Sequence, residues 1–294
     1  MNTRLLTREY DYISPATLAE ALEVLSAKQN VRILAGGTDL IVKLKTGADL
    51  EMDYMLDIKR IAELDYICMD DDGLRIGALA KLSAIEKFPA VREHYPALHE
   101  ALQAMAAIAV RNMGTMAGNL CNASPVADTA GPAICYDAKL ILSGTRGKRE
   151  VLVTEFFTGL GKSMLAEDEI LTEIFLPKPK AFTGSVFCKK TRVKADIAKI
   201  SATALFAREG QKVSACRIAM GAIAITPLYL KDISESLIGR EINKAVIAEA
   251  AAAAAAAIKP IDDNHSTAEY RKEIAALIVE EVLTKAWQRA GGEL

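Results

Sequence analysis

The stretch of sequence that decides the fold is Val31-Arg32-Ile33-Leu34-Ala35-Gly36-Gly37-Thr38-Asp39-Leu40. Its first four residues are a short run with β-branched side chains, which predicts a strand, and Gly36 and Gly37 end that strand abruptly. Because glycines put no side chains in the way, the backbone N–H groups of such a turn can converge on a phosphate. The alternative is a tight turn that only redirects the chain. Neither a G-x-G-x-x-G fingerprint nor a P-loop lysine motif occurs in this stretch, so a phosphate cradle here would be of another type.

The segments around this turn predict an α/β unit. Before it, apolar residues between Leu18 and Leu25 recur at helical spacing, with Thr17 and Glu20 offering a capping box and Ser14-Pro15 an alternative start. After it, Tyr54 to Ile58 predicts another strand. The glycine turn is therefore expected at the end of a strand within an α/β unit.

A second glycine-rich stretch, Arg111 to Asp128, is the most turn-rich part of the chain. It follows a helix predicted over Pro96 to Ala109 and interrupts all periodicity. Loops of this length in compact domains are more often functional than not, although a structural loop whose asparagines and serines satisfy one another is the alternative. Two glycine-rich loops about 80 residues apart could grip one extended diphosphate ligand from both sides, which favours a dinucleotide such as FAD.

A domain boundary is predicted at Pro177-Lys178-Pro179-Lys180, because two prolines cannot continue a central strand. We therefore expect one domain over residues 1–177, with subdomains of about 1–58 and 59–177, and a C-terminal domain over 181–294. The elements predicted between and beyond the loops are strands at Leu74 to Leu79 and Ile170 to Leu176, a hairpin of Lys139 to Ser143 with Glu150 to Val153, antiparallel strands Ile200 to Ala207 and Val213 to Met220, and helices Asn243 to Ile258 and Thr267 to Arg289.

The composition excludes several classes of protein. The chain has 294 residues, 51% of them hydrophobic, and 36 basic against 38 acidic side chains give a net charge of -2. This balance argues against a dedicated nucleic-acid binder and against a basic membrane-binding surface. No apolar run is long enough for a membrane span, and the charged start does not fit a signal peptide. The cysteines are scattered without metal-site or redox spacing, which favours reduced thiols in the cytoplasm and no metal site: Cys68, Cys121, Cys135, Cys188 and Cys216.

Five segments carry a resemblance to a known family: Leu34 to Leu40, Arg111 to Asn119, Ala123 to Asp128, Lys189 with Arg192 and Asp196 to Ala198, and Gly221 with Thr226 to Leu228. They resemble the FAD-binding (medium) subunit of the molybdenum hydroxylases, the family of xanthine dehydrogenase, carbon monoxide dehydrogenase and aldehyde or nicotinate hydroxylases. The likeness runs from about Tyr12 to the C-terminus in the expected order. It departs at Ala117 and Ala106, where the family commonly has glycine.

The resemblance implies a fold of the vanillyl-alcohol-oxidase type, an α/β (α+β) architecture in which two α/β subdomains hold FAD and a smaller α+β domain follows. Backbone amides of the two loops would surround the diphosphate, and short polar side chains of the second loop would bond diphosphate, ribitol and ribose oxygens. Plain core packing is the alternative for Met105 and Leu171. The implied cofactor-binding residues are Ile33, Leu34, Ala35, Gly36, Gly37, Thr38, Asp39, Leu40, Met105, Gly114, Thr115, Ala117, Gly118, Asn119, Asn122, Ser124, Asp128, Leu171 and Lys189.

The function implied is electron transfer by a flavoprotein oxidoreductase subunit. Electrons would pass from [2Fe-2S] clusters of a small partner subunit through FAD to a final acceptor, with NAD as one candidate, while a large partner subunit would hold the molybdenum cofactor. No catalytic side chain is implied, because the cofactor carries the chemistry. Two alternatives remain open: a free-standing FAD-dependent reductase of the same fold, and a non-catalytic nucleotide-binding scaffold subunit.

Overall fold

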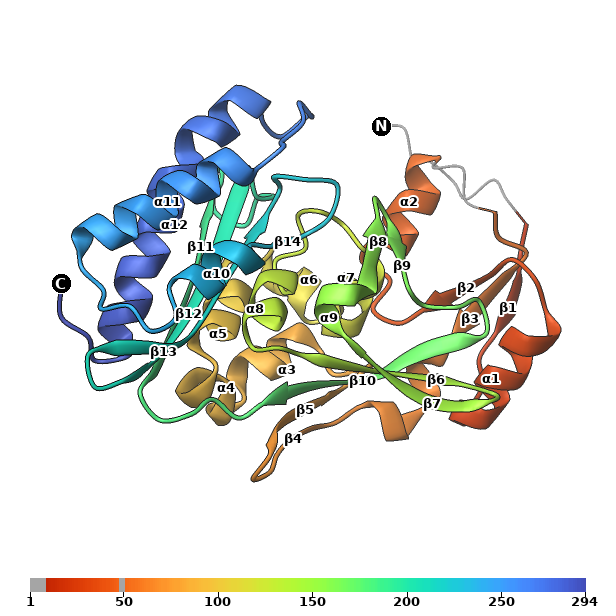
Figure 1. The fold of residues 1–294 in the computed structure, drawn as a ribbon. Coiled ribbons are helices and arrows are strands. Elements are labelled where there is room, and N and C mark those ends of the chain that lie inside the picture. Colours follow the sequence, from red (N-terminus) through yellow and green to blue (C-terminus); the bar gives the residue numbers. More distant parts are fainter. Residues whose placement is uncertain (1–8, 48–50) are drawn as a thin grey trace.

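The computed structural model describes residues 9–47 and 51–294 and begins with a small parallel sheet (Figure 1). Its strands β1 (Asp11–Ile13), β2 (Val31–Leu34) and β3 (Tyr54–Asp57) lie in the order β1-β3-β2. Thr17 caps helix α1 (Leu18–Ala27), because its hydroxyl accepts from the Glu20 N–H at 3.2 Å while the Glu20 carboxylate accepts from the Ala16 N–H. Thr17 and Glu20 therefore set the start of this helix as predicted, although the Glu20 carboxylate accepts from the N–H one residue before the N-cap. The remaining elements of this part are α2 (Leu40–Thr46) and the 3-10 turns η1 (Ile58–Arg60) and η2 (Ala62–Leu64).

A five-stranded antiparallel sheet follows, in the order β4-β5-β10-β6-β7. The predicted hairpin is confirmed, with a two-residue turn at Thr145-Arg146. Three helices lie between this sheet and the C-terminal sheet (Figure 1): α3 (Leu82–Lys87), α4 (Pro89–His94) and α5 (Pro96–Ala104). The strands are β4 (Ile67–Met69), β5 (Gly73–Gly77), β6 (Lys139–Gly144), β7 (Gly147–Leu152) and β10 (Glu169–Pro177); α9 (Val153–Phe156), β8 (Phe157–Gly159) and β9 (Lys162–Ser163) connect β7 to β10.

The second glycine-rich stretch is more regular than its composition predicts. The helix expected over Pro96 to Ala109 ends at Ala104, and Ala106 has a left-handed backbone with φ of 43° that no continuous helix permits. The stretch expected to lack regular structure contains α7 (Met116–Cys121), flanked by α6 (Ile108–Arg111) and α8 (Ala130–Cys135). Helix α7 forms because the Thr115 hydroxyl accepts from the Gly118 N–H at 3.0 Å and caps its first turn.

The C-terminal part is a four-stranded antiparallel sheet in the order β11-β12-β13-β14. Helix α12 covers one face, with α11 packed against α12, and α5 and α8 contact the other face (Figure 1). Strand β12 is consequently buried along most of its length. Both predicted helices are confirmed, with Asn243 and Thr267 as their N-caps. The elements are β11 (Thr183–Lys190), β12 (Ile200–Glu209), β13 (Lys212–Gly221), β14 (Leu228–Tyr229), α10 (Lys231–Ser236), α11 (Lys244–Ala257) and α12 (Ala268–Arg289).

The hydrophobic cores show how these parts are joined. The largest core combines α1, the inner face of the five-stranded sheet and the helices above it, and Phe187, Leu205 and Ala219 of the C-terminal sheet reach into it. Polar contacts reinforce this junction, because the Glu100 carboxylate accepts from the Phe187 N–H at 2.9 Å. The expected mixed α/β fold class with an added C-terminal sheet-and-helix unit is thus confirmed. No helix in the described part of the chain is long and apolar enough to cross a membrane.

Candidate functional site

The two glycine-rich loops lie against each other. At Gly36 an added Cβ would lie 2.4 Å from the Met113 carbonyl oxygen and 2.7 Å from the Gly114 Cα, so the two backbones touch. At Gly37 the backbone is left-handed, with φ of 73°, a conformation that disfavours any side chain. The sequence prediction that residues about 80 positions apart meet at one place is therefore realised in the fold.

The first loop offers free backbone donors. Among the residues that the structure describes, nothing accepts a hydrogen bond from the N–H groups of Gly36, Gly37 and Thr38. The loop follows the carboxyl end of β2, and α2 begins directly after Asp39. In α/β sheets, ligands bind beyond the carboxyl ends of the parallel strands. This end of the small sheet is accordingly suited to an anionic group.

The second loop uses its polar side chains internally. The Asn119 side-chain oxygen accepts from the Thr129 hydroxyl at 2.7 Å, and the Ser124 hydroxyl accepts from the Val126 N–H at 3.4 Å. The Asn122 side-chain oxygen accepts from Lys43 Nζ at 2.5 Å, which links the second loop to α2. The loop is thus held by its own side chains, as the structural alternative predicts, although Asn119 and Asn122 each keep an amide donor.

A buried ion pair closes the far end of the second loop. Lys189 Nζ, on β11, lies 2.8 Å from Asp128 Oδ2, and the two side chains are only 4% and 9% exposed. The other carboxylate oxygen, Asp128 Oδ1, is buried and has no hydrogen-bond partner. Burial raises the pKa of the Asp128 carboxyl, and the lysine offsets only part of that effect. Because a buried acceptor without a donor is costly, this oxygen fits a hydroxyl or amine of a bound molecule.

Ala117 and Ala106, which stand where the family commonly has glycine, have different backbone conformations. Ala117 is buried inside α7 without a left-handed backbone, so its methyl group causes no backbone strain. Ala106 instead has a left-handed backbone that glycine would adopt more easily. Met105 and Leu171 are both buried within the largest core, at 7% and 3% exposure. Ile33 and Leu34 belong to β2, and Leu34 packs in a small core with Met55.

Sequence reasoning missed two cations at the site. Lys43 bonds Asn122 across the loops, and Arg111 is buried and donates to two backbone carbonyls just before the second loop. Lys43 is one of two lysines in the last turn of α2, the other being Lys45, and nothing in the sequence distinguishes the two. Arg111 was part of the recognised motif, but its partners become visible only in the fold.

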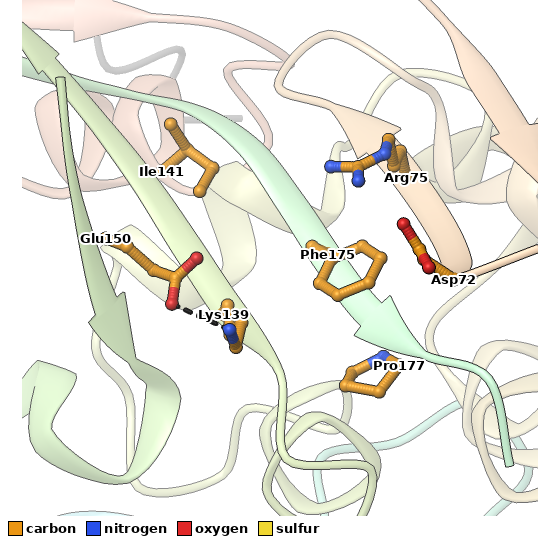
Figure 2. A pocket seen from close by; sticks show the side chains of 7 residues that line it. All are labelled: Asp72, Arg75, Lys139, Ile141, Glu150, Phe175 and Pro177. Carbon is orange, nitrogen blue, oxygen red and sulfur yellow. Dashed lines mark ion pairs between the residues drawn. The ribbon is translucent and has the colours of Figure 1, made fainter. Parts of the chain in front are cut away.

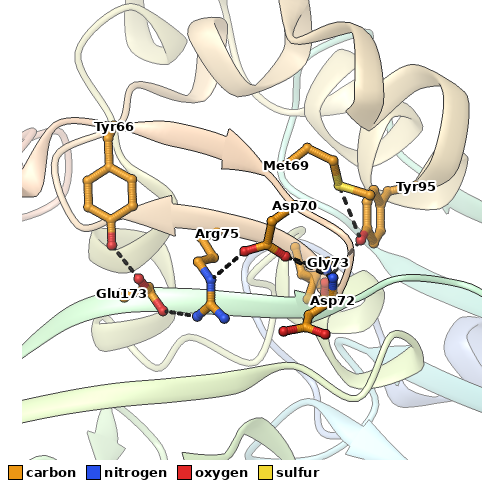
Figure 3. A network of polar contacts seen from close by, with 9 residues as sticks. Tyr66, Met69, Asp70, Asp72, Gly73, Arg75, Tyr95 and Glu173 are labelled. Atoms are coloured by element: carbon orange, nitrogen blue, oxygen red, sulfur yellow. Dashed lines mark hydrogen bonds and ion pairs between the residues drawn. The ribbon is translucent and has the colours of Figure 1, made fainter.

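A cavity of about 430 Å³ lies elsewhere, on the outer face of the five-stranded sheet (Figure 2). Its charges are largely neutralised within the sheet: Lys139 pairs with Glu150 at 2.9 Å, and Arg75 lies over the Phe175 ring. In the network of Figure 3, Arg75 also bonds Asp70 at 3.0 Å and Glu173 at 2.9 Å. Neither glycine-rich loop lines this cavity. None of the residues that line it has a buried polar side-chain atom without a hydrogen-bond partner, as Asp128 does.

The described residues contain no group of three or more histidine, cysteine or acidic side chains able to hold a metal ion. The site therefore consists of free backbone N–H groups, the left-handed turn at Gly37, and the buried Asp128 carboxylate, one oxygen of which has no hydrogen-bond donor. Two facing loops of this kind can hold an extended dinucleotide along its diphosphate, and the residues fit FAD. The fold and the site together define a dinucleotide-binding protein.

Comparison with known proteins gives the family. Residues 8–179 match the family described as the FAD binding domain in molybdopterin dehydrogenase, and residues 185–288 match the CO dehydrogenase flavoprotein C-terminal domain. The chain belongs to this family of FAD-binding oxidoreductase subunits. Its cofactor is FAD.

The similarity extends over nearly the full length of the relatives. The xanthine dehydrogenase FAD-binding subunit of Escherichia coli O157:H7 is 32% identical over 96% of this chain and 98% of its own length. The carbon monoxide dehydrogenase medium chain of Hydrogenophaga pseudoflava is 30% identical over 97% of this chain and 99% of its own. A solved carbon monoxide dehydrogenase structure from the same organism matches with a TM-score of 0.93, 30% identity and coverage of 97% of this chain and 99% of that chain. The structure of quinoline 2-oxidoreductase from Pseudomonas putida 86 matches with a TM-score of 0.89 and 29% identity, covering 96% of this chain and 98% of that chain.

Proposed function

We propose that this chain is the flavoprotein subunit through which a molybdenum-containing hydroxylase passes its electrons to a final acceptor. The observation that carries the proposal is the pair of touching glycine-rich loops, the second of which ends at Asp128 with its unpartnered carboxylate oxygen. When bound, FAD supplies the redox chemistry. The residues of this chain bind and orient the cofactor, and no side chain serves as acid or base.

The contacts support the assignment of different residues to different groups of the cofactor. The free N–H groups of Gly36, Gly37 and Thr38 would donate to the diphosphate. Asp128 Oδ1 would accept from a cofactor hydroxyl, while Lys189 holds the carboxylate in place through Oδ2. Asn119 and Asn122 would use the amide donors that the loop leaves free.

The proposed partners are a small [2Fe-2S] subunit and a large subunit with the molybdenum cofactor. Relatives of this chain carry names such as medium chain and FAD-binding subunit, which denote parts of larger enzymes. Exposed apolar side chains adjoin both loops in the sequence and support docking of another chain: Val42 on α2, Ile108 and Val110 on α6, and Met113 after α6. NAD is a candidate final acceptor. We place the assembly in the cytoplasm, since all five cysteines are free.

Purification of the native complex with identification of every cofactor tests the function. We expect this chain to co-purify with an iron–sulfur chain and a large molybdenum chain, and the visible spectrum to show flavin and iron–sulfur absorption together. Turnover of an organic substrate by this chain alone would support the free-standing reductase instead. A colourless chain that FAD cannot reconstitute would leave only the scaffold alternative.

The bound FAD should be non-covalent. The first loop contains no histidine or cysteine, and burial raises the pKa of the Cys121 thiol in the second loop to about 12, which disfavours the reactive thiolate. Acid denaturation should therefore release all flavin into solution. Flavin colour that stays on the precipitated protein would contradict this.

The division into domains at residues 178–180 also belongs to the proposal. It is supported by the end of β10 at Pro177 and by the start of the C-terminal sheet at Thr183. Limited proteolysis of the FAD-loaded chain should give its first cut within this connection if the two parts are separate domains. First cuts inside either part would argue for another division.

A further inference from the structure

Arg111 occupies an unusual position at the entrance to the second loop. It is the last residue of α6, and its residue exposure is only 9%. Its guanidinium makes three contacts: Nε donates to Glu86 Oε2 at 3.0 Å, and one terminal nitrogen donates to the carbonyl oxygens of Met105 and Ala106, both at 2.8 Å. A buried arginine that binds two consecutive carbonyls fixes the conformation of that backbone segment.

The segment that Arg111 binds is strained. Ala106 has φ of 43°, and the left-handed region is energetically unfavourable for a residue with a Cβ. Such a conformation persists only where surrounding contacts hold it. The two hydrogen bonds from Arg111 are contacts of this kind, and Glu86 holds the guanidinium from its other side.

The same helix supports the second loop itself. Glu86 lies on α3, whose first residue, Leu82, donates its N–H to the Gly114 carbonyl at 3.0 Å. Lys81, directly before α3, forms a backbone bridge with Thr115. The turn at Met105 and the loop at Gly114 are therefore both anchored to α3, one through Arg111 and one through the backbone.

We propose that Arg111, oriented by Glu86, is a positioning residue for the FAD site, and that it acts by holding Ala106 in its left-handed conformation. Through α3, which binds both segments, this fixes the turn at Met105 relative to Gly114, whose backbone touches the first loop at Gly36. The proposal rests on FAD binding at the two loops as proposed above. Arg111 itself need not touch the cofactor.

The test uses the full chain with the subunits that co-purify with it, stripped of flavin and titrated with FAD. In Arg111→Lys, a single ammonium cannot reach both carbonyls and the carboxylate, so we expect FAD to bind roughly tenfold more weakly, with a shifted visible absorption band of the bound flavin. Adding Ala106→Gly removes the left-handed penalty. The double variant should recover FAD affinity to within about threefold and regain the wild-type band, while its melting temperature stays low because the ammonium leaves at least one of the three acceptors without a donor.

Ala195→Gly is the matched control, because Ala195 also has a left-handed backbone, with φ of 68°, in the exposed connection between β11 and β12. It should not rescue Arg111→Lys. If Arg111→Lys does not fold, Glu86→Gln with and without Ala106→Gly gives the same comparison, with smaller changes. Unchanged FAD affinity and spectrum in the folded fraction, or a loss that Ala106→Gly does not repair, would overturn the proposal. Failure of the wild-type chain to bind FAD would instead refute the proposed function.

Discussion

The first loop, residues 35–39, and the second, residues 111–128, touch each other but differ in how their polar groups are used. The first leaves the N–H groups of Gly36, Gly37 and Thr38 free within the described structure. The second engages most of its short polar side chains: Thr115 caps α7, Asn119 bonds Thr129, and Asn122 bonds Lys43. Two stretches with the same glycine-rich composition therefore serve binding in different ways.

This difference in hydrogen bonding predicts how each loop responds to mutation. A loop that binds through backbone amides depends on its shape, so a change there should reduce affinity more than stability. A loop held by a side-chain network contributes to folding, so a change there should reduce both. Gly118 shows the contrast, because its N–H donates to Thr115 inside the helix and its backbone is not left-handed.

The largest effect is expected from Asp128→Ala in the second loop. It leaves the ammonium of Lys189, which is 4% exposed, buried without its partner, and should lower the free energy of unfolding by about 3–5 kcal/mol. FAD affinity should fall as well, by about 1.5–3 kcal/mol, because the acceptor for a cofactor hydroxyl is lost. Denaturant titration and FAD titration measure the two effects.

A double variant provides the control for this ion pair. Asp128→Leu combined with Lys189→Met removes both charges, so it should be more stable than Asp128→Ala while still binding FAD weakly. If Asp128→Ala binds FAD like the wild type, the unpartnered oxygen has no role in the site.

The next largest effect is expected from Gly36→Ala. The added methyl would meet the backbone of Met113 at 2.4 Å, and backbone atoms cannot move aside as a side chain does. Overpacking of this kind costs about 1–3 kcal/mol. We expect FAD affinity to fall by roughly 10- to 100-fold, measured by titration of the apo-chain, because the loops are forced apart. Normal affinity in a folded Gly36→Ala chain would show that the loops need not touch to bind.

Much of the fold was predictable because local sequence determines it. The β-branched run at β2, the capping box at Thr17 and the caps at Asn243 and Thr267 are short-range signals that tertiary contacts did not override. The helix α7 was missed because Gly118 and Asn119 lower its helix propensity, whereas the cap at Thr115 stabilises it through a single hydrogen bond. Composition outweighed that one signal in the prediction.

The residues of the candidate site were largely predictable, but the pairs that they form were not. The polar contacts that complete it join residues far apart in the chain: Lys43 with Asn122, and Asp128 with Lys189. No local pattern specifies such pairs, because each depends on how the sheets pack together. The left-handed backbone of Ala106 was also not predicted, because alanine disfavours that conformation, although the glycine that the family commonly has at this position is compatible with it.

A smaller effect is expected from Gly37→Ala. The left-handed backbone of Gly37 should cost about 1–2 kcal/mol with alanine, whereas the nearby Leu34 side chain can move aside. Gly47→Ala is a closely matched control, since Gly47 has φ of 74° and an added Cβ there would meet open space. Both variants should lose similar stability in thermal unfolding, but only Gly37→Ala should weaken FAD binding. Equal affinities would mean that the first loop does not contact the cofactor.

The smallest effects should separate the two loops most cleanly, through their threonines. Thr115→Ala removes the cap of α7 and should lower the free energy of unfolding by about 1 kcal/mol, while Thr115→Ser, which keeps the capping hydroxyl, should lose little. Within the described structure the Thr38 hydroxyl has no hydrogen-bond partner, so Thr38→Ala should leave stability unchanged and cost about 1 kcal/mol of FAD affinity, through one lost bond to the cofactor. Denaturant and FAD titrations of the three variants give both quantities. A stability loss in Thr38→Ala, or none in Thr115→Ala, would show that the loops do not differ as their contacts indicate.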